Sequence, residues 1–172
     1  ALGGTFDHLH SGHRILLSSA LLLTSHKLIV GLTAPPLLKS KRHAALVQGL
    51  EERARAVRAF CARFSAAVTV DVVEISDVAG PTAWDGAIDA LIVSRETVSG
   101  AEAIAKIREA NGLPPLEVYV IDVISADDAS LPHEDAERLK DAKISSTAIR
   151  GWIAEREKER RAREAPAEET PV

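Results

Sequence analysis

The chain opens with Ala1-Leu2-Gly3-Gly4-Thr5-Phe6-Asp7-His8-Leu9-His10-Ser11-Gly12-His13, and this stretch decides the fold. A short apolar piece runs into two glycines, and a long apolar pattern with helical spacing follows from Ile15 onward. This order predicts a strand, a glycine turn and the N-terminus of a helix. Glycines let the backbone approach a ligand closely, and the first N–H groups of a helix have no partner within it. Because these free donors and the helix dipole favour anions, the turn is a candidate phosphate site, to which two imidazoles add donors.

Strand and helix patterns alternate along the rest of the chain. We expect further strands at 28–32, 68–75, 91–93 and 118–124, and helices at 48–64, 101–110 and from 146 onward. Such alternation indicates a parallel sheet with helices on both faces. The sequence therefore predicts a Rossmann-like α/β fold with a five-stranded parallel sheet in the order 3-2-1-4-5. Ligands bind such sheets at the carboxyl ends of the strands, where the strand order reverses.

Composition places the chain among globular proteins. We assign residues 1–153 to one domain and residues 154–172 to a charged helical extension with a disordered tail. No apolar run approaches the roughly 20 residues of a membrane helix, and a net charge of −4 disfavours a general nucleic-acid binder. The single cysteine, Cys61, excludes an intrachain disulfide and suits a reducing compartment, so we expect a cytoplasmic protein. Because the chain begins without Met almost inside a strand, we also expect sequence upstream of Ala1.

Two motifs carry a resemblance to a known family. Residues 3–13, Gly-Gly-Thr-Phe-Asp-x-x-His-x-Gly-His, resemble the signature of the HxGH nucleotidyltransferases. Residues 144–150, Ile-Ser-Ser-Thr-Ala-Ile-Arg, resemble the second signature of the adenylyl-transferring branch. The loop at 37–41 and the segment at 93–113 resemble the pantetheine-phosphate adenylyltransferase family of eukaryotic and archaeal type. Members of that family transfer the adenylyl group of ATP to 4'-phosphopantetheine and release pyrophosphate.

The resemblance implies catalytic roles at both ends of the first motif and in the basic loop. His13 would touch the α-phosphate and stabilise the transition state, and His10 would bind nearby phosphate oxygens. Thr5 would position the phosphate of the nucleophile. Lys41 would contact the transferred phosphoryl region, with Lys39 as the alternative. Because a phosphate nucleophile needs no strong base, positioning and charge neutralisation suffice for this reaction.

The same resemblance implies a nucleotide site built from four distant segments. Its contacts would come from the glycine turn, the basic loop, the segment after the fourth strand and the start of the last helix: Gly3, Gly4, Phe6, Lys39, Ser94, Glu96, Thr97, Arg108, Ser145, Ser146, Thr147 and Arg150. Mg²⁺ would accompany ATP, and we assign no residue as a metal ligand. Taken alone, the hydroxyls of the second motif are better explained by helix capping, and the first motif is what favours a role in phosphate binding. Relatives often carry Asn where Ala105 stands, so a side-chain contact there is absent.

We therefore expect an enzyme of coenzyme A biosynthesis. The resemblance implies that it binds ATP, 4'-phosphopantetheine, and dephospho-coenzyme A or coenzyme A as product or regulator. We expect a monomer that associates with other coenzyme A biosynthesis enzymes and with neither nucleic acid nor a membrane. A nicotinamide-mononucleotide adenylyltransferase shares both signatures and is the nearest alternative. A catalytically silent nucleotide-binding domain in a multi-enzyme assembly is the alternative from another class.

Overall fold

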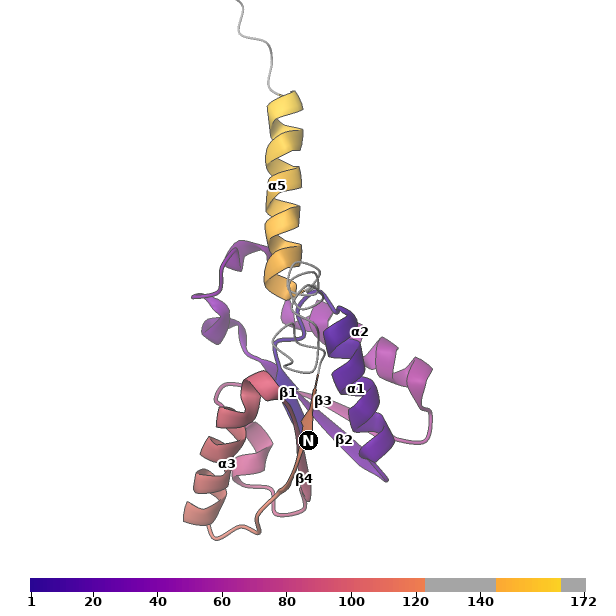
Figure 1. Ribbon diagram of the computed structural model, residues 1–172, viewed down its shortest axis with the longest axis vertical. Helices are drawn as coiled ribbons and strands as arrows, with labels where there is room; N and C mark the ends of the chain where they lie inside the picture. Colours follow the sequence, from indigo (N-terminus) through magenta and orange to yellow (C-terminus); the bar gives the residue numbers. More distant parts are fainter. Residues whose placement is uncertain (123–144, 165–172) are drawn as a thin grey trace, which may run out of the picture.

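A computed structural model describes residues 1–122 and 145–164 of the chain. The elements follow one another as β1 (Leu2–Gly4), α1 (Ser11–Leu23), β2 (Lys27–Thr33), α2 (Leu50–Phe64), β3 (Thr69–Ile75), β4 (Ala90–Ser94), α3 (Val98–Ala110), β5 (Glu117–Ile121) and α5 (Ser146–Glu164) (Figure 1). Short 3-10 helices lie between them: η1 (Pro35–Leu38), η2 (Ala44–Leu46), η3 (Gly80–Ala83) and η4 (Arg95–Thr97). Every predicted strand and helix has a counterpart. The last two residues of the strand predicted at 118–124, and the tail at 165–172, lie outside the described residues.

The paired strands are all parallel, but they form two sheets and not one. One sheet has the order β1-β2-β3, and the other pairs β4 with β5. The predicted five-stranded order 3-2-1-4-5 is therefore wrong, although the α/β class with parallel strands is right. The Ala1 nitrogen donates to the Ala90 carbonyl at 2.7 Å, and the Ile92 N–H donates to the Ala1 carbonyl at 2.8 Å. Both bonds are made by Ala1, which precedes β1, and among the described strands β1 itself forms a ladder with β2 alone.

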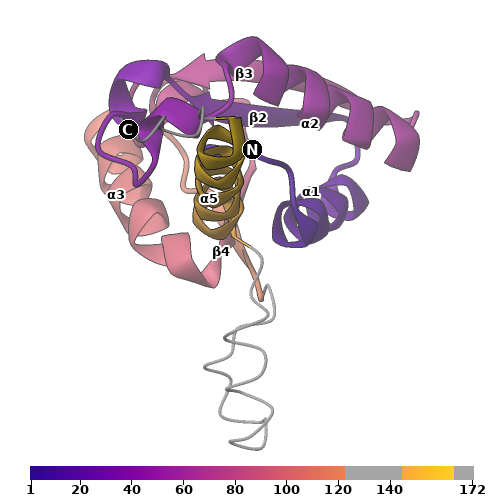
Figure 2. The ribbon, with the colours of Figure 1, turned by 90° about the horizontal axis from the view of Figure 1, so that it is seen from above.

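Two apolar clusters cover opposite sides of β4. Ile92 belongs to a large cluster with residues of α1, α2 and β2, whereas Leu91 and Val93 pack against α3. Successive side chains of a strand point to opposite faces, so one strand serves both clusters. Figure 2 shows α1 on one side of β4 and α3 on the other. Cys61 is fully buried in the large cluster and burial raises the pKa of its thiol, as a structural cysteine requires.

Helix α5 extends from the strand-bearing body as a single rod (Figure 1). It runs without interruption from Ser146 to Glu164, so the domain boundary predicted at residue 153 falls inside a continuous helix. Its first turns contact η2, and Arg150 is buried there. In the two described ranges, no helix combines the length and the apolarity needed to cross a membrane.

Candidate functional site

Helix α1 begins with free backbone donors. His10 precedes the helix as its N-cap residue, and among the described residues its side chain makes no capping hydrogen bond. The Arg14 N–H makes the first helical hydrogen bond, to the His10 carbonyl at 3.0 Å. The N–H groups of Ser11, Gly12 and His13 therefore precede the first helical bond and are available to an anion.

The rings of His10 and His13 stack at this helix end. Their centroids are 3.9 Å apart with an interplanar angle of 28°, and the Phe6 ring lies 5.2 Å from that of His13. Burial, followed by the neighbouring His10, lowers the pKa of His13 to about 4. Burial also lowers the pKa of His10, against the opposing charges of Asp7 and Glu96. Both imidazoles are consequently neutral at pH 7, and each carries one N–H donor.

Neither ring is held by a hydrogen bond at Nδ1. The Nδ1 atoms of His10 and His13 are buried and have no partner within the described part of the chain. Buried polar atoms are normally paired, and exceptions occur where a group has a functional role. Stacking and packing therefore position these rings, and their unpaired Nδ1 atoms mark them as candidates for a functional role.

The turn between β1 and α1 adopts an unusual backbone conformation. Phe6 and His8 have φ angles of 51° and 44°, in the left-handed region that residues other than glycine rarely occupy. Such residues persist where their surroundings determine the conformation, and they cluster at functional sites. Gly4 is part of the reason for the turn, because a Cβ at this position would lie 3.1 Å from the Phe6 ring. We call residues 5–8 the Thr5–His8 turn.

Asp7 connects the two motifs. Its carboxylate, which is completely buried, accepts a hydrogen bond from the Gln48 N–H at 2.8 Å and pairs with the Arg150 guanidinium. Its backbone carbonyl accepts a hydrogen bond from the Ser146 hydroxyl at 2.8 Å. One residue of the first motif thus contacts two residues of the second. Asp7 stands within the first motif, but its residue type and position did not predict this role.

The second motif is engaged mainly within the protein. Ser145 Oγ accepts from the Ala148 N–H at 3.2 Å, which is the capping arrangement that we gave as the alternative. Arg150 is 1% exposed and also donates to the Arg42 carbonyl at 3.0 Å and to Thr147 Oγ1 at 3.2 Å. The guanidinium expected on the phosphates of ATP is therefore anchored in the body, while Thr147 is exposed at the helix start.

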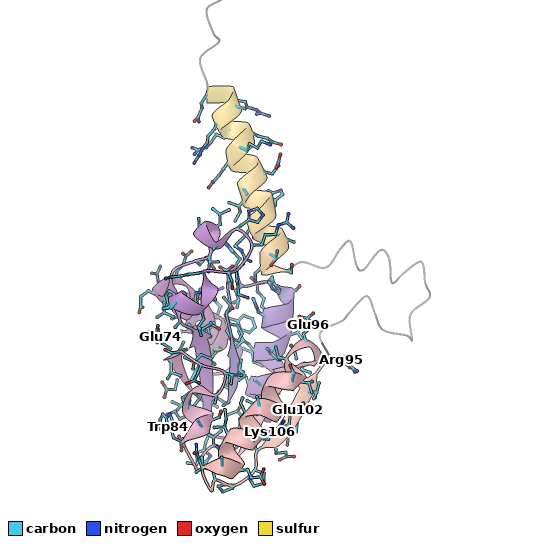
Figure 3. All side chains as sticks on the ribbon, turned by 90° about the vertical axis from the view of Figure 1, so that its left-hand side faces the viewer. Glu74, Trp84, Arg95, Glu96, Glu102 and Lys106 are labelled. Atoms are coloured by element: carbon cyan, nitrogen blue, oxygen red, sulfur yellow. The ribbon has the colours of Figure 1, made fainter. Side chains whose placement is uncertain are left out.

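The segment after β4 lies near the histidines. Ser94 and Thr97 form a capping box in which the Ser94 N–H donates to Thr97 Oγ1 at 3.1 Å. The charge of Glu96 raises the pKa of His10, which places η4 within electrostatic range of α1. Figure 3 shows Arg95 and Glu96 at the end of the body toward α5, and Lys106 farther along α3, away from α5.

Arg108 belongs to the opposite end of the strands. Its guanidinium is 1% exposed and donates to the carbonyls of Thr82 at 2.7 Å, Asp85 at 3.0 Å and Pro114 at 2.8 Å. Pro114 precedes β5, so this cluster lies at the amino edge of the strands, whereas the histidines follow the carboxyl end of β1. We expected Arg108 to contact ATP. Its guanidinium instead donates to backbone carbonyls at the amino edge of the strands, away from the histidines.

The basic loop leaves both lysines exposed. Lys39 and Lys41 lie between η1 and η2, and within the described ranges neither ammonium group has an ion-pair partner. Both stay candidates for the phosphoryl contact.

The two other predicted residues of the glycine turn lie close to the body. Thr5 is half-buried. A Cβ added at Gly3 would lie 3.4 Å from the Ile75 side chain.

Sequence reasoning missed residues that hold the site from α2 and the segment before it. Gln48 Oε1 accepts from the His8 N–H at 2.6 Å, and His8 Nε2 lies 2.9 Å from the Leu46 carbonyl oxygen. Arg53 is fully buried and bonded to backbone carbonyls. One signal was present in the sequence: Arg53 stands four residues before Val57 on the apolar face of a predicted helix, where a charged side chain needs a buried partner.

The fold and the site together define a class of protein. Parallel strands lead into an α1 N-terminus with two stacked histidines, and a hydroxyl-rich helix start is joined to that turn through Asp7. The model of the cytidylyltransferase-like family matches residues 1–151. The chain therefore belongs to the cytidylyltransferase-like family. Within the described residues, no three His, Cys, Asp or Glu side chains are grouped to hold a metal ion.

Within this family, the chain is similar to several individual proteins. A phosphopantetheine adenylyltransferase of Saccharomyces cerevisiae is 43% identical over 150 residues, which are 87% of this chain and 47% of the relative. A phosphopantetheine adenylyltransferase of Methanopyrus kandleri is 36% identical over 90% of this chain and 89% of the relative. A crystal structure of a protein of unknown function from Archaeoglobus fulgidus has a TM-score of 0.61 and 28% identity, and it covers 72% of this chain and 97% of that one. An uncharacterized protein of Schizosaccharomyces pombe is 39% identical over 90% of this chain and 48% of the relative. The chain thus spans about half the length of these yeast relatives.

Proposed function

We propose that the chain transfers the adenylyl group of ATP to 4'-phosphopantetheine, which gives dephospho-coenzyme A and pyrophosphate in coenzyme A biosynthesis. One observation carries this proposal: stacked, neutral His10 and His13 lie at an uncapped helix N-terminus that Asp7 joins to the start of α5. The acceptor is supported by the yeast and archaeal relatives, which are named phosphopantetheine adenylyltransferases.

The reaction is an in-line displacement at phosphorus. An oxygen of the 4'-phosphate attacks the α-phosphorus of ATP, a new P–O bond forms, and the bond to the bridging oxygen of pyrophosphate breaks with its electron pair. The nucleophile already carries negative charge, so no side chain has to remove a proton. The protein contributes by holding the two phosphates in line and by placing donors around the equatorial oxygens.

The donors fit that task. In this proposal the free N–H groups at the start of α1 and one imidazole N–H each from His10 and His13 surround the α-phosphate. Neutral imidazoles donate without adding charge in the free enzyme, and the negative phosphates of bound ATP favour their protonation. Lys39 or Lys41, whose ammonium groups have no ion-pair partner in the described ranges, supplies a positive charge to the phosphates. Thr5 orients the acceptor phosphate.

Magnesium arrives with the substrate. Mg²⁺ commonly binds through phosphate oxygens, waters and few protein carboxylates, so in this proposal the triphosphate of ATP carries the ion. Ser145, Ser146 and Thr147 at the start of α5, and Ser94, Glu96 and Thr97 after β4, are the proposed contacts of the nucleotide. Cytoplasmic location, a monomeric state, association with other coenzyme A biosynthesis enzymes and binding of coenzyme A as a regulator are parts of the same proposal.

Pyrophosphate release tests the acceptor directly. ATP and Mg²⁺ are offered with 4'-phosphopantetheine in one reaction and with nicotinamide mononucleotide in another. We expect turnover with the first acceptor only. Turnover with the mononucleotide alone would replace the proposed acceptor while keeping the phosphate site, and ATP binding without turnover of either would favour a silent nucleotide-binding domain.

A further inference from the structure

Arg53 connects the ends of two strands from beneath the candidate site. It lies in the first turns of α2 and is completely buried. One terminal nitrogen of its guanidinium donates to the Thr5 carbonyl at 2.8 Å, and the other donates to the Thr33 carbonyl at 3.1 Å. Thr5 follows β1 and Thr33 ends β2, so the planar fork holds the carboxyl ends of neighbouring parallel strands in one geometry.

The same side chain reaches the rest of the turn through Gln48. Arg53 Nε donates to the Gln48 carbonyl at 3.0 Å. The Gln48 backbone N–H donates to the Asp7 carboxylate at 2.8 Å, and its side-chain oxygen accepts from the His8 N–H at 2.6 Å. Arg53 therefore holds both ends of the Thr5–His8 turn, directly at Thr5 and through Gln48 at Asp7 and His8.

The turn requires such support because of its backbone. Phe6 and His8 both have positive φ angles, 51° and 44°, and each such residue costs about 1–3 kcal/mol unless its surroundings impose the conformation. A trans peptide points its C=O and N–H in opposite directions. The bond from Arg53 to the Thr5 carbonyl consequently fixes the Phe6 N–H on the side of the turn facing away from α2.

The charge of Arg53 also differs from that of most buried cations, which pair with a carboxylate. Its hydrogen bonds within the described ranges go to carbonyl oxygens, not to a carboxylate. Burial lowers the pKa of the guanidinium, and Asp7 and Glu74 oppose this effect from a longer range. A buried cation whose charge no hydrogen-bonded carboxylate neutralises contributes a positive potential beneath the turn.

We infer that Arg53 is a positioning residue for the transfer reaction: it sets the Thr5–His8 turn and the end of β2 at the spacing that aligns the acceptor phosphate with the α-phosphate. This inference rests on the proposed adenylyl transfer. Arg53 touches no reacting atom, and its effect passes through Thr5 and Gln48. Lysine cannot replace it, because one ammonium group does not reproduce a planar fork that spans two carbonyls.

The chain offers a matched control in Arg108. Arg108 is equally buried and likewise donates to backbone carbonyls, but at the amino edge of the strands. Arg53→Met and Arg108→Met remove the same kind of interaction from opposite ends. A merely structural role for Arg53 predicts that the two variants behave alike once the folded fraction is equalised.

The test compares wild type, Arg53→Met, Arg53→Lys, Arg108→Met and Arg108→Lys at a temperature where each is folded. We expect the Arg53 variants to lose at least about tenfold in kcat while the Kd of ATP changes by less than about threefold. We expect the Arg108 variants to keep kcat within about twofold. Equal kcat losses at both positions, or unchanged kcat in the Arg53 variants, would overturn the inference.

Hydrogen exchange provides a readout that needs no turnover. Replacing Arg53 is expected to accelerate amide exchange in residues 5–8 and 33–34, whereas replacing Arg108 is expected to accelerate it in residues 82–88 and at Leu116, which follows the two prolines. If wild type releases no pyrophosphate with 4'-phosphopantetheine, the proposed function fails. Amide exchange in residues 5–8 still measures whether Arg53 holds the turn. Unchanged exchange in residues 5–8 of Arg53→Met and Arg53→Lys would overturn the inference whatever the activity.

Discussion

The carboxylate of Asp7 and the guanidinium of Arg150 form a buried ion pair although 143 positions separate them in the sequence. The Asp7 side chain has no exposed surface, and that of Arg150 retains 2%. The pair holds the start of α5 against the turn that follows β1. It thereby gives the second motif a structural role beside the proposed nucleotide contacts.

Breaking this pair should destabilise the fold strongly. Arg150→Met leaves a carboxylate buried without its cation, which costs about 3–5 kcal/mol in comparable cases. Urea unfolding measures the difference. Lys27→Met is the control, since Lys27 pairs with Asp71 at 2.8 Å with side chains 52% and 43% exposed, and exposed pairs contribute about 0–1 kcal/mol. Equal losses in both variants would show that the buried pair has no special role.

His13→Ala should lower turnover without unfolding the protein. Removing one preorganised donor from a charged transition state costs about 10²- to 10³-fold in kcat. The ring is partly exposed and lies at the start of α1, so the free energy of unfolding should change little. Steady-state kinetics, calorimetric ATP binding and thermal unfolding separate these effects. His26→Ala, an exposed histidine after α1, is the control, and a His13→Ala enzyme with normal kcat contradicts the mechanism.

Stability should fall in mild acid because of the histidine pair. The pKa of His13 is about 4 in the folded protein, against 6.5 as its ordinary value. Between these values the unfolded chain binds more protons than the native state, so the contribution of His13 is complete above pH 6.5 and is lost as the pH falls toward 4. Unfolding of wild type and His13→Gln as a function of pH checks this: the stability of wild type relative to the variant should fall as the pH drops from 6.5 toward 4 and stay constant above 6.5. A His13 imidazole that titrates near 6.5 by NMR would refute it.

Gly4→Ala should disturb the turn through Phe6. The added methyl group would lie 3.1 Å from the aromatic ring, which is 1% exposed and has little freedom to withdraw. Overpacking of this kind costs about 1–3 kcal/mol. Gly4→Ala combined with Phe6→Leu should recover part of the loss, because the smaller side chain makes room. Chemical denaturation of the four proteins of this cycle measures the coupling, and strictly additive effects would exclude the contact as the cause.

Alanine substitution should show which of Lys39 and Lys41 contacts the phosphates. The lysine that contacts phosphate should lower kcat/KM when replaced, whereas the other should affect it by less than about twofold, as exposed side chains without partners do. Both side chains are exposed, so neither variant should change the unfolding free energy appreciably. Kinetics with ATP and 4'-phosphopantetheine decide between Lys39 and Lys41. Normal kinetics in both single variants and in the double variant would remove the loop from the proposed site.

Local patterns carried most of the fold prediction. Strand and helix positions followed from β-branched runs and helical spacing, and the N-terminus of α1 followed from the glycines, His10 and His13. The predicted sheet order was wrong because the hydrogen bonds from Ala1 to β4 do not continue along β1, and strand propensity does not determine which folded strands pair.

The sequence by itself determined the α/β class, the helix start that bears two histidines and the two motifs of the family. Periodicity and short motifs depend on residues that are neighbours in the sequence, so they can be recognised without knowledge of the tertiary structure. Only the tertiary structure decided that Arg150 pairs with Asp7, that Arg53 holds the Thr5–His8 turn and that Arg108 serves the opposite edge. An arginine has the same chemistry at every position, and its role depends on which carbonyl or carboxylate oxygens packing brings within reach of its planar fork.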